Sequence, residues 1–221
     1  MRISTIIIGC LSVAVLAYGA LSLWRRRAAP EPPISAAGGS AEIIPAIAGI
    51  PYWLQNDPAW SNEIISGSND TMAAAGCLVS CVAMTLSSFD LHITPGELCR
   101  ELNANHGFTA QGQLVWGAVT TCTKGAFMTA FPPLTHMAID NELRGGRPVI
   151  AKIMLWGQVP HWVLMIGKQH TGYVMIDPLN TQRAVVPVST RSTHIHAIRV
   201  LHRSGSQPTP TTPSLPTPSH P

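Results

Sequence analysis

Residues 75–86 read AGCLVSCVAMTL, and the pattern of this segment predicts a helix. Apolar side chains recur at the spacing of one helix face, at Leu78, Val82 and Leu86. Gly76 interrupts the chain just before this pattern begins, so Cys77 falls in or beside the first turn of the expected helix. The sequence therefore places a thiol at the amino end of an apolar helix.

Three more helices are expected on the carboxyl side of this one. Thr94 precedes a proline and stands three residues before Glu97, which is the pattern of a capped helix start, and we expect that helix to run to about Asn103. Further helices are expected near residues 113–122 and 134–144, the second ended by a Gly-Gly pair.

Beyond the fourth helix the apolar pattern becomes strand-like. The predicted strands are residues 148–155, 161–167, 172–176, 184–187 and 195–201. Short connections between them favour antiparallel hairpins. Helices followed by a sheet indicate an α+β fold, with an N-terminal helical part packed on a C-terminal antiparallel sheet.

Composition excludes several classes of protein. The chain has 221 residues, of which 11% are charged and 46% are hydrophobic, and its formal net charge is +3. A disordered polyelectrolyte carries far more charge, and a nucleic-acid-binding protein carries more positive charge in clusters. Five cysteines are too few for a domain built on disulfides. We expect one globular domain and no nucleic-acid partner.

The amino end predicts a membrane anchor. Residues 3–24 carry no charge and are long enough to cross a bilayer, and arginines flank this stretch on both sides. We therefore assign residues 1–27 to a single-pass anchor. Two alternatives stay open: a cleaved signal peptide with a site at Ala17-Tyr18-Gly19, or a lipoprotein with a lipid on Cys10.

The sidedness of the globular domain rests on two opposing signals. Three arginines after the apolar stretch favour a cytoplasmic domain, whereas residues 204–221 form a Pro/Thr-rich tail of a kind more common outside the cytoplasm. We lean weakly to an extracytoplasmic domain, which would be secreted if the amino end is cleaved. Residues 28–40 are interpreted as a Pro/Ala/Gly linker, and residues 41–203 as the globular domain.

Cys77, His161 and Asp177 are the candidate reacting residues. A helix amino terminus favours the thiolate over the thiol, and a thiolate is a nucleophile that needs a base. His161 begins a predicted strand, and Asp177 ends the next one 16 residues later. Because adjacent antiparallel strands bring such positions together, the carboxylate can orient the imidazole and stabilise its charged form.

Gln55, in an early loop, is the fourth candidate. Its side-chain amide could stabilise an oxyanion near the thiolate. Each of the four residues has an ordinary explanation when taken alone: a core cysteine, a strand-edge histidine, an Asp-Pro turn and a surface glutamine. Their order along the chain, Gln, Cys, His and Asp, is that of papain-like cysteine hydrolases.

The chain resembles the C39-like cysteine peptidases, a papain-like family, in their bacterial and phage branch. The stretches that carry the resemblance are YWLQNDPAW at 52–60, AGCLVSCVAMTL at 75–86, TPGELCRELN at 94–103, GRPVIAKI at 146–153 and HWVLMIGKQHTGYVMIDP at 161–178. The resemblance implies a papain-like fold with Cys77 as nucleophile, His161 as general base and acid, and Asp177 orienting His161. It also implies an oxyanion hole made by Gln55 and the Cys77 backbone N–H. Leu78 stands where many members have Gly.

The remaining thiols and histidines are expected to have other roles. Cys81 lies one helical turn after Cys77 and could compete as nucleophile, but only Cys77 has the favourable helix terminus. Cys81, Cys99 and Cys122 are expected in the core, and outside the cytoplasm two of them could form a disulfide. His194 and His196 form a strand-spaced pair without further ligands, so we expect no metal, and no organic cofactor is required.

The sequence thus predicts a membrane-anchored cysteine peptidase that hydrolyses a peptide-type amide through a Cys-His-Asp triad and a thioacyl intermediate. The expected partners are a peptide or protein substrate, including cell-wall peptide, and the membrane through the amino end. Two alternatives stay open: an inactive peptide-binding module of the C39-like fold, and a cell-wall peptide amidase or endopeptidase of the same fold.

Overall fold

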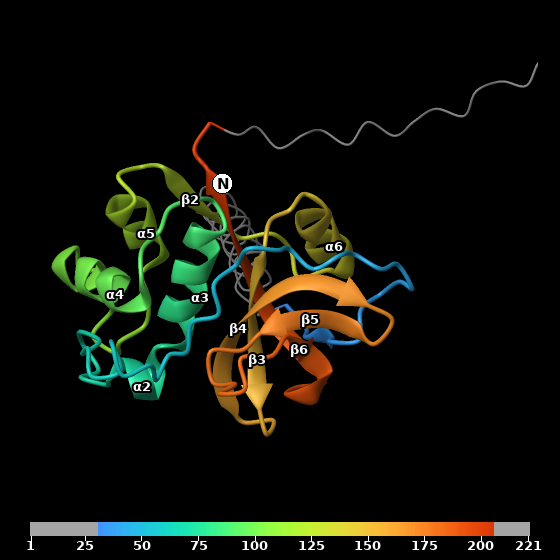
Figure 1. The fold of residues 1–221 in the computed structure, drawn as a ribbon, viewed down its shortest axis with the longest axis horizontal. Coiled ribbons are helices and arrows are strands. Elements are labelled where there is room, and N and C mark those ends of the chain that lie inside the picture. Colours follow the sequence, from blue (N-terminus) through green and yellow to red (C-terminus); the bar gives the residue numbers. More distant parts are fainter. Residues whose placement is uncertain (1–30, 206–221) are drawn as a thin grey trace, which may run out of the picture. The chain divides into compact units, whose positions relative to one another are not determined.

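A computed structural model of the chain describes residues 31–205. Helices come first and most of the sheet second, as expected for an α+β fold (Figure 1). None of the helices within this range is long and apolar enough to cross a membrane. The expected anchor at residues 1–27, Cys10 and nearly all of the tail lie outside the described residues.

Helix α3, Cys77–Ser87, confirms the prediction from the apolar pattern, and its first residue is Cys77. A short helix that the sequence did not predict, α2 at Met72–Ala75, precedes it. The side chain of Thr71 caps α2 by accepting a hydrogen bond from the backbone of Ala74. Gly76 ends α2 and also precedes α3, so the two helices meet at a single glycine.

The other predicted helices are present, with shifted starts. Helix α4, Pro95–Ala104, has the predicted capping box between Thr94 and Glu97. Helix α5, Trp116–Cys122, starts later than expected because Phe108 and Leu114 form a β-bridge that holds the preceding chain extended. Helix α6, His136–Arg144, starts after its capping residue Thr135 and ends at Gly145.

The sheet is antiparallel, as predicted. Its main strands are β3 (Val149–Leu155), β4 (Val159–Gln169), β5 (Gly172–Ile176), β6 (Val186–Pro187) and β7 (His194–Arg203). Strands β3, β4, β5 and β6 are neighbours in chain order, but β7 returns to the other edge of β3. A short 3₁₀ helix, η1 at Val188–Thr190, lies between β6 and β7 and belongs to that return.

Two strands were not predicted, and both pair with β7. They are β1, Ile34–Ser35, and β2, Phe127–Ala130. Strand β1 lies inside the segment expected as a linker, and Ala36 beside it is fully buried. The part of the chain that packs on the sheet therefore begins before the expected boundary at residue 41. Small residues before this boundary permit the close approach: a Cβ on Gly38 would lie 2.8 Å from Cε of Lys168.

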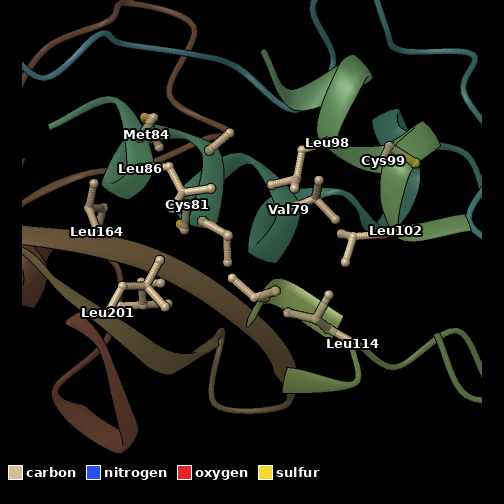
Figure 2. Packing of buried hydrophobic residues seen from close by; sticks show 14 of the residues in the cluster. Val79, Cys81, Met84, Leu86, Leu98, Cys99, Leu102, Leu114, Leu164 and Leu201 are labelled. Carbon is tan, nitrogen blue, oxygen red and sulfur yellow. The ribbon is translucent and has the colours of Figure 1, made fainter. Parts of the chain in front are cut away.

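The sheet separates two apolar cores. On one face, α3 packs on the sheet and α4 packs on α3, and Figure 2 shows side chains of this core such as Leu86 and Leu98. On the other face, Ile139 and Leu143 of α6 pack against alternate residues of β3, among them Ile153. Because side chains alternate along a strand, β3 contributes to both cores. This arrangement fixes α3, and with it Cys77, against the sheet.

Candidate active site

Cys77 lies at the start of α3, where the chain turns sharply. Gly76 leaves no room for a side chain, because a Cβ there would lie 2.4 Å from the carbonyl oxygen of Met72. Among residues 31–205, the backbone N–H of Cys77 donates to no carbonyl oxygen, as is usual for the first turn of a helix. The Cys77 side chain is partly exposed. It therefore combines solvent access with a free N–H at a positive helix end.

His161 and Asp177 form the expected pair. Nε2 of His161 donates to Oδ1 of Asp177 at 2.8 Å, and both side chains are buried. Strands β4 and β5 pair antiparallel with Leu164 opposite Ile176. This register brings the start of β4 beside the residue that follows β5. The acceptor carboxylate fixes the tautomer with hydrogen on Nε2, which leaves Nδ1 for a second partner.

Three further groups hold Asp177 in place. The backbone N–H of Leu179 donates to Oδ1 at 2.9 Å, and Nε of Arg191 donates to Oδ2 at 2.8 Å. The hydroxyl of Tyr52 donates to the carbonyl oxygen of Asp177 at 3.0 Å and accepts from its N–H at 3.3 Å. No sequence pattern predicts a role for Tyr52 or Arg191. Tyr52 lies in the segment 52–60, close to Gln55, whereas Arg191 has no motif around it.

The electrostatics of His161 favour its charged form. Burial by itself lowers the pKa of His161, but hydrogen bonds to Asp177 and Cys77 and the charges of these two groups outweigh burial and raise it to about 9. For Asp177 the effect of burial is opposite, because burial raises the pKa of a carboxyl group. Hydrogen bonds from His161 and Leu179, together with the charges of His161 and Arg191, outweigh burial and lower the pKa of Asp177 below its ordinary value. Asp177 is therefore a carboxylate, and His161 is held ready to carry a proton.

Cys77 and His161 line one cleft, with a volume of about 500 Å³. Gln55 lines the same cleft, whereas Asp177 lies fully buried behind His161. The structure thus brings all four candidate residues to one place, three at the surface of the cleft and one beneath it.

Gln55 is 2% exposed, so a surface position is wrong for this residue. Its backbone N–H donates to the carbonyl oxygen of Pro178 at 3.0 Å, and its Nε2 donates to that of Ala73 at 2.8 Å. Nε2 has a second hydrogen. Within the described chain, Oε1 of Gln55 is buried without a hydrogen-bond partner. The amide is therefore fixed between the Asp177 loop and α2, at the margin of the cleft.

The other thiols do not share the properties of Cys77. Burial, and then the charges of Cys77 and Asp177, raise the pKa of Cys81 well above its ordinary value. Burial likewise raises the pKa of Cys99 to about 11 and that of Cys122 to a smaller extent. Among the described residues, Cys77, Cys81, Cys99 and Cys122 are free thiols. Cys81 is fully buried and Cys77 is not, which separates the two candidate nucleophiles.

His194 and His196 do not form part of a metal site in the structure. Nδ1 of His194 lies 2.9 Å from the hydroxyl of Thr193. Within residues 31–205, no group of three His, Cys, Asp or Glu side chains is placed to hold a metal ion.

Comparison with known proteins gives a structural similarity and no match to a family model or a curated protein. A solved structure, described as that of a candidate C39-like peptidase from Bacillus anthracis, is 15% identical, with a TM-score of 0.47. The similarity covers 73% of this chain and 98% of that one.

Proposed function

We propose that this chain is a cysteine peptidase that hydrolyses a peptide-type amide, with Cys77 as nucleophile, His161 as general base and acid, and Asp177 orienting His161. The observation that carries the proposal is the buried 2.8 Å hydrogen bond between His161 and Asp177, in the wall of a cleft that Cys77 also lines. A peptide-binding module has no need for this combination.

The reaction follows from the arrangement of these groups. The thiol proton passes to Nδ1 of His161, and the Cys77 sulfur attacks the carbonyl carbon of the substrate amide. His161 then gives its proton to the leaving nitrogen as the C–N bond breaks, which leaves a thioester on Cys77. A water molecule loses a proton to His161 and attacks the thioester, which releases the acid and restores the thiol. The raised pKa of His161, about 9, suits a group that holds a proton beside a thiolate.

The oxyanion that forms in each step needs hydrogen-bond donors. The unpaired N–H of Cys77 is one donor at the amino end of α3. The second hydrogen of Gln55 Nε2 is the other, because the first is held by Ala73. Two donors in a largely buried site are what acyl transfer requires.

The walls of the cleft suit a polypeptide. They are largely apolar, and Trp116 and Trp162 pack edge to face with ring centroids 5.9 Å apart. Val159, which lines the cleft, and Phe131, which packs on Trp116, are exposed apolar side chains. Exposed apolar groups beside an active-site cleft favour contact with substrate side chains. The proposed substrate is a peptide or protein, with cell-wall peptide among the candidates, and the proposed location is at a membrane, through residues 1–27.

Thiol reactivity tests the proposal. We expect iodoacetamide at pH 6 to alkylate Cys77 at least about tenfold faster in the wild-type chain than in His161→Ala, since free thiols are protonated at that pH. Mass spectrometry assigns the site, and Cys81→Ala serves as the matched control that keeps the rate. A Cys77 rate equal to that of Cys122, or unaffected by His161→Ala, would contradict the peptidase and favour a binding module.

A further inference from the structure

The cleft also contains a charge that the proposed reaction does not use. We propose that Lys152 binds a carboxylate of the substrate, so that the enzyme prefers peptides with an acidic group near the scissile bond. This inference rests on the proposed function and names its substrate class. The carboxylate can belong to an Asp or Glu side chain or to the end of a peptide chain.

Lys152 is held on the central part of the sheet. It lies in the middle of β3, with Trp162 of β4 opposite it on one side and Ala197 of β7 on the other. It lines the same cleft as Cys77 and His161. A residue between two paired strands has a fixed backbone, so the side chain of Lys152 starts from a defined position in the wall of the cleft.

Within the described part of the chain, the ammonium group of Lys152 has no counter-ion. Among residues 31–205, none of those lining the cleft is Asp or Glu, and the side chain of Lys152 makes no hydrogen bond or ion pair. Asp177, the carboxylate behind the cleft, is already held by His161 and Arg191.

A second lysine of the sheet shows the contrast. Lys168 is fully buried, and its Nζ lies 2.9 Å from Asp140 and 2.8 Å from the hydroxyl of Ser40. The protein therefore pairs Lys168 with the carboxylate of Asp140, at a buried position that no ligand can reach. Among the described residues it supplies no carboxylate to Lys152, which faces the cleft. A half-buried cation without a partner favours ligands that bring the opposite charge.

The surroundings of Lys152 strengthen this preference. The Trp116–Trp162 pair forms an apolar wall of the cleft, and charges attract more strongly where water is excluded. One titratable neighbour of Lys152 is basic: burial, and then the charges of His194 and Lys152, lower the pKa of His196. An incoming carboxylate therefore meets the positive charge of Lys152, and none of the described residues that line the cleft is a competing carboxylate.

Covalent peptide probes test the preference on the full chain. Peptidyl acyloxymethyl ketones place residues before the reacting carbonyl, and chloroacetyl peptides place residues after the reacting carbon. Each series compares Glu with Gln and Asp with Asn at one position at a time. The chloroacetyl series also compares a free terminal carboxylate with its amide, which distinguishes the two sources of the charge. The measured quantity is the second-order rate constant for labelling Cys77.

We expect one carboxylate position to raise this rate constant about tenfold, equivalent to about 1.4 kcal/mol. Lys152→Gln should remove the preference, Lys152→Arg should keep most of it, and Lys152→Glu should reverse it in favour of a Lys-containing probe. Each probe rate constant is divided by the iodoacetamide rate constant of Cys77 in the same Lys152 variant, which removes any change in the reactivity of the thiol itself. Equal rates for every charged and neutral pair, or a preference that survives Lys152→Gln, would overturn the assignment of Lys152. Iodoacetamide labelling that does not depend on His161 would instead overturn the peptidase itself.

Discussion

Arg191 donates its Nε hydrogen to Oδ2 of Asp177 at 2.8 Å, the carboxylate oxygen that His161 leaves free. The carboxylate is thus fixed through both oxygens. Arg191 directly follows η1, in the connection by which the chain returns to β7, and 37% of its side chain is exposed. The loop between β6 and β7 therefore has a part in positioning the proposed base.

Removal of Arg191 should reduce turnover more than substrate binding. In Arg191→Ala, we expect kcat to fall about tenfold with little change in KM, because a charge-assisted hydrogen bond contributes about 1.5–3 kcal/mol and water replaces part of it. The pKa of Asp177 should rise without Arg191, so activity should be lost at a higher pH on the acid side of the profile. Peptide hydrolysis measured against pH checks both effects.

Two controls separate positioning from folding. Arg191→Lys should recover part of kcat, and Arg183→Ala should change neither kcat nor the acid side of the profile, because Arg183 pairs with Asp57 instead. An unchanged pH profile in Arg191→Ala would show that Arg191 does not act through Asp177.

The stability of the fold should depend on pH through His161. Its pKa is about 9 in the folded chain, against an ordinary value of 6.5. Between pH 6.5 and pH 9, the folded state therefore keeps a proton on His161 that the unfolded state has lost. The resulting stabilisation is complete below pH 6.5 and is lost as pH rises through 9. It contributes on the order of 3 kcal/mol to the free energy of unfolding.

Urea unfolding at intervals from pH 6 to pH 9.5 measures this loss. His161→Gln should flatten the dependence, and Cys77→Ala should weaken it, because the hydrogen bond and charge of Cys77 contribute to the raised pKa of His161. A wild-type and a His161→Gln curve with the same slope would contradict the assignment.

The buried pair of Lys168 and Asp140 should be coupled energetically. Nζ of Lys168 and the hydroxyl of Tyr173 both donate to Asp140, each at 2.9 Å. Loss of one partner leaves an unpaired buried charge, so Asp140→Ala and Lys168→Met should each cost about 3–5 kcal/mol of unfolding free energy. The double variant should cost less than the sum of the two.

Urea unfolding of the four chains gives the coupling energy. A double variant whose cost equals the sum of the single costs would show that the pair is not coupled. Lys168 and Asp140 do not line the cleft. Each folded variant should therefore react with iodoacetamide at Cys77 at the wild-type rate.

The elements that could be predicted are those that depend on residues close together in the sequence. The apolar period and Gly76 predicted α3, and the capping residues predicted α4, because these signals depend only on near neighbours in the chain. The pairing of His161 with Asp177 was expected from one hairpin, in which chain order determines the strand neighbours. The roles of these residues in a reaction stay a proposal.

The parts that could not be predicted depend on distant contacts. Strand β1 has two residues and small neighbours, and it becomes a strand only because β7 lies beside it. Arg191 reaches Asp177 because β7 returns to β3, a topology that no local pattern specifies. Gln55 was expected in a loop, which is correct, but its burial depends on its contacts with Pro178 and Ala73, which are far away in the sequence.

Gln55 should stabilise the transition state and not the thiolate. One Nε2 hydrogen is held by Ala73, and the other is free for the oxyanion. Gln55→Glu has the same shape but lacks the amide donor, so kcat should fall about 10²–10³-fold. Thermal unfolding of the variant shows whether the fold is kept.

A peptide aldehyde distinguishes this role from a general effect on Cys77. The aldehyde forms a thiohemiacetal whose oxygen occupies the oxyanion position, whereas alkylation by iodoacetamide forms no oxyanion. Gln55→Glu should therefore weaken aldehyde inhibition by at least about tenfold and change the iodoacetamide rate much less. If both fall by the same factor, Gln55 acts on the thiolate or on the position of α3, and the N–H of Cys77 is left as the proposed donor.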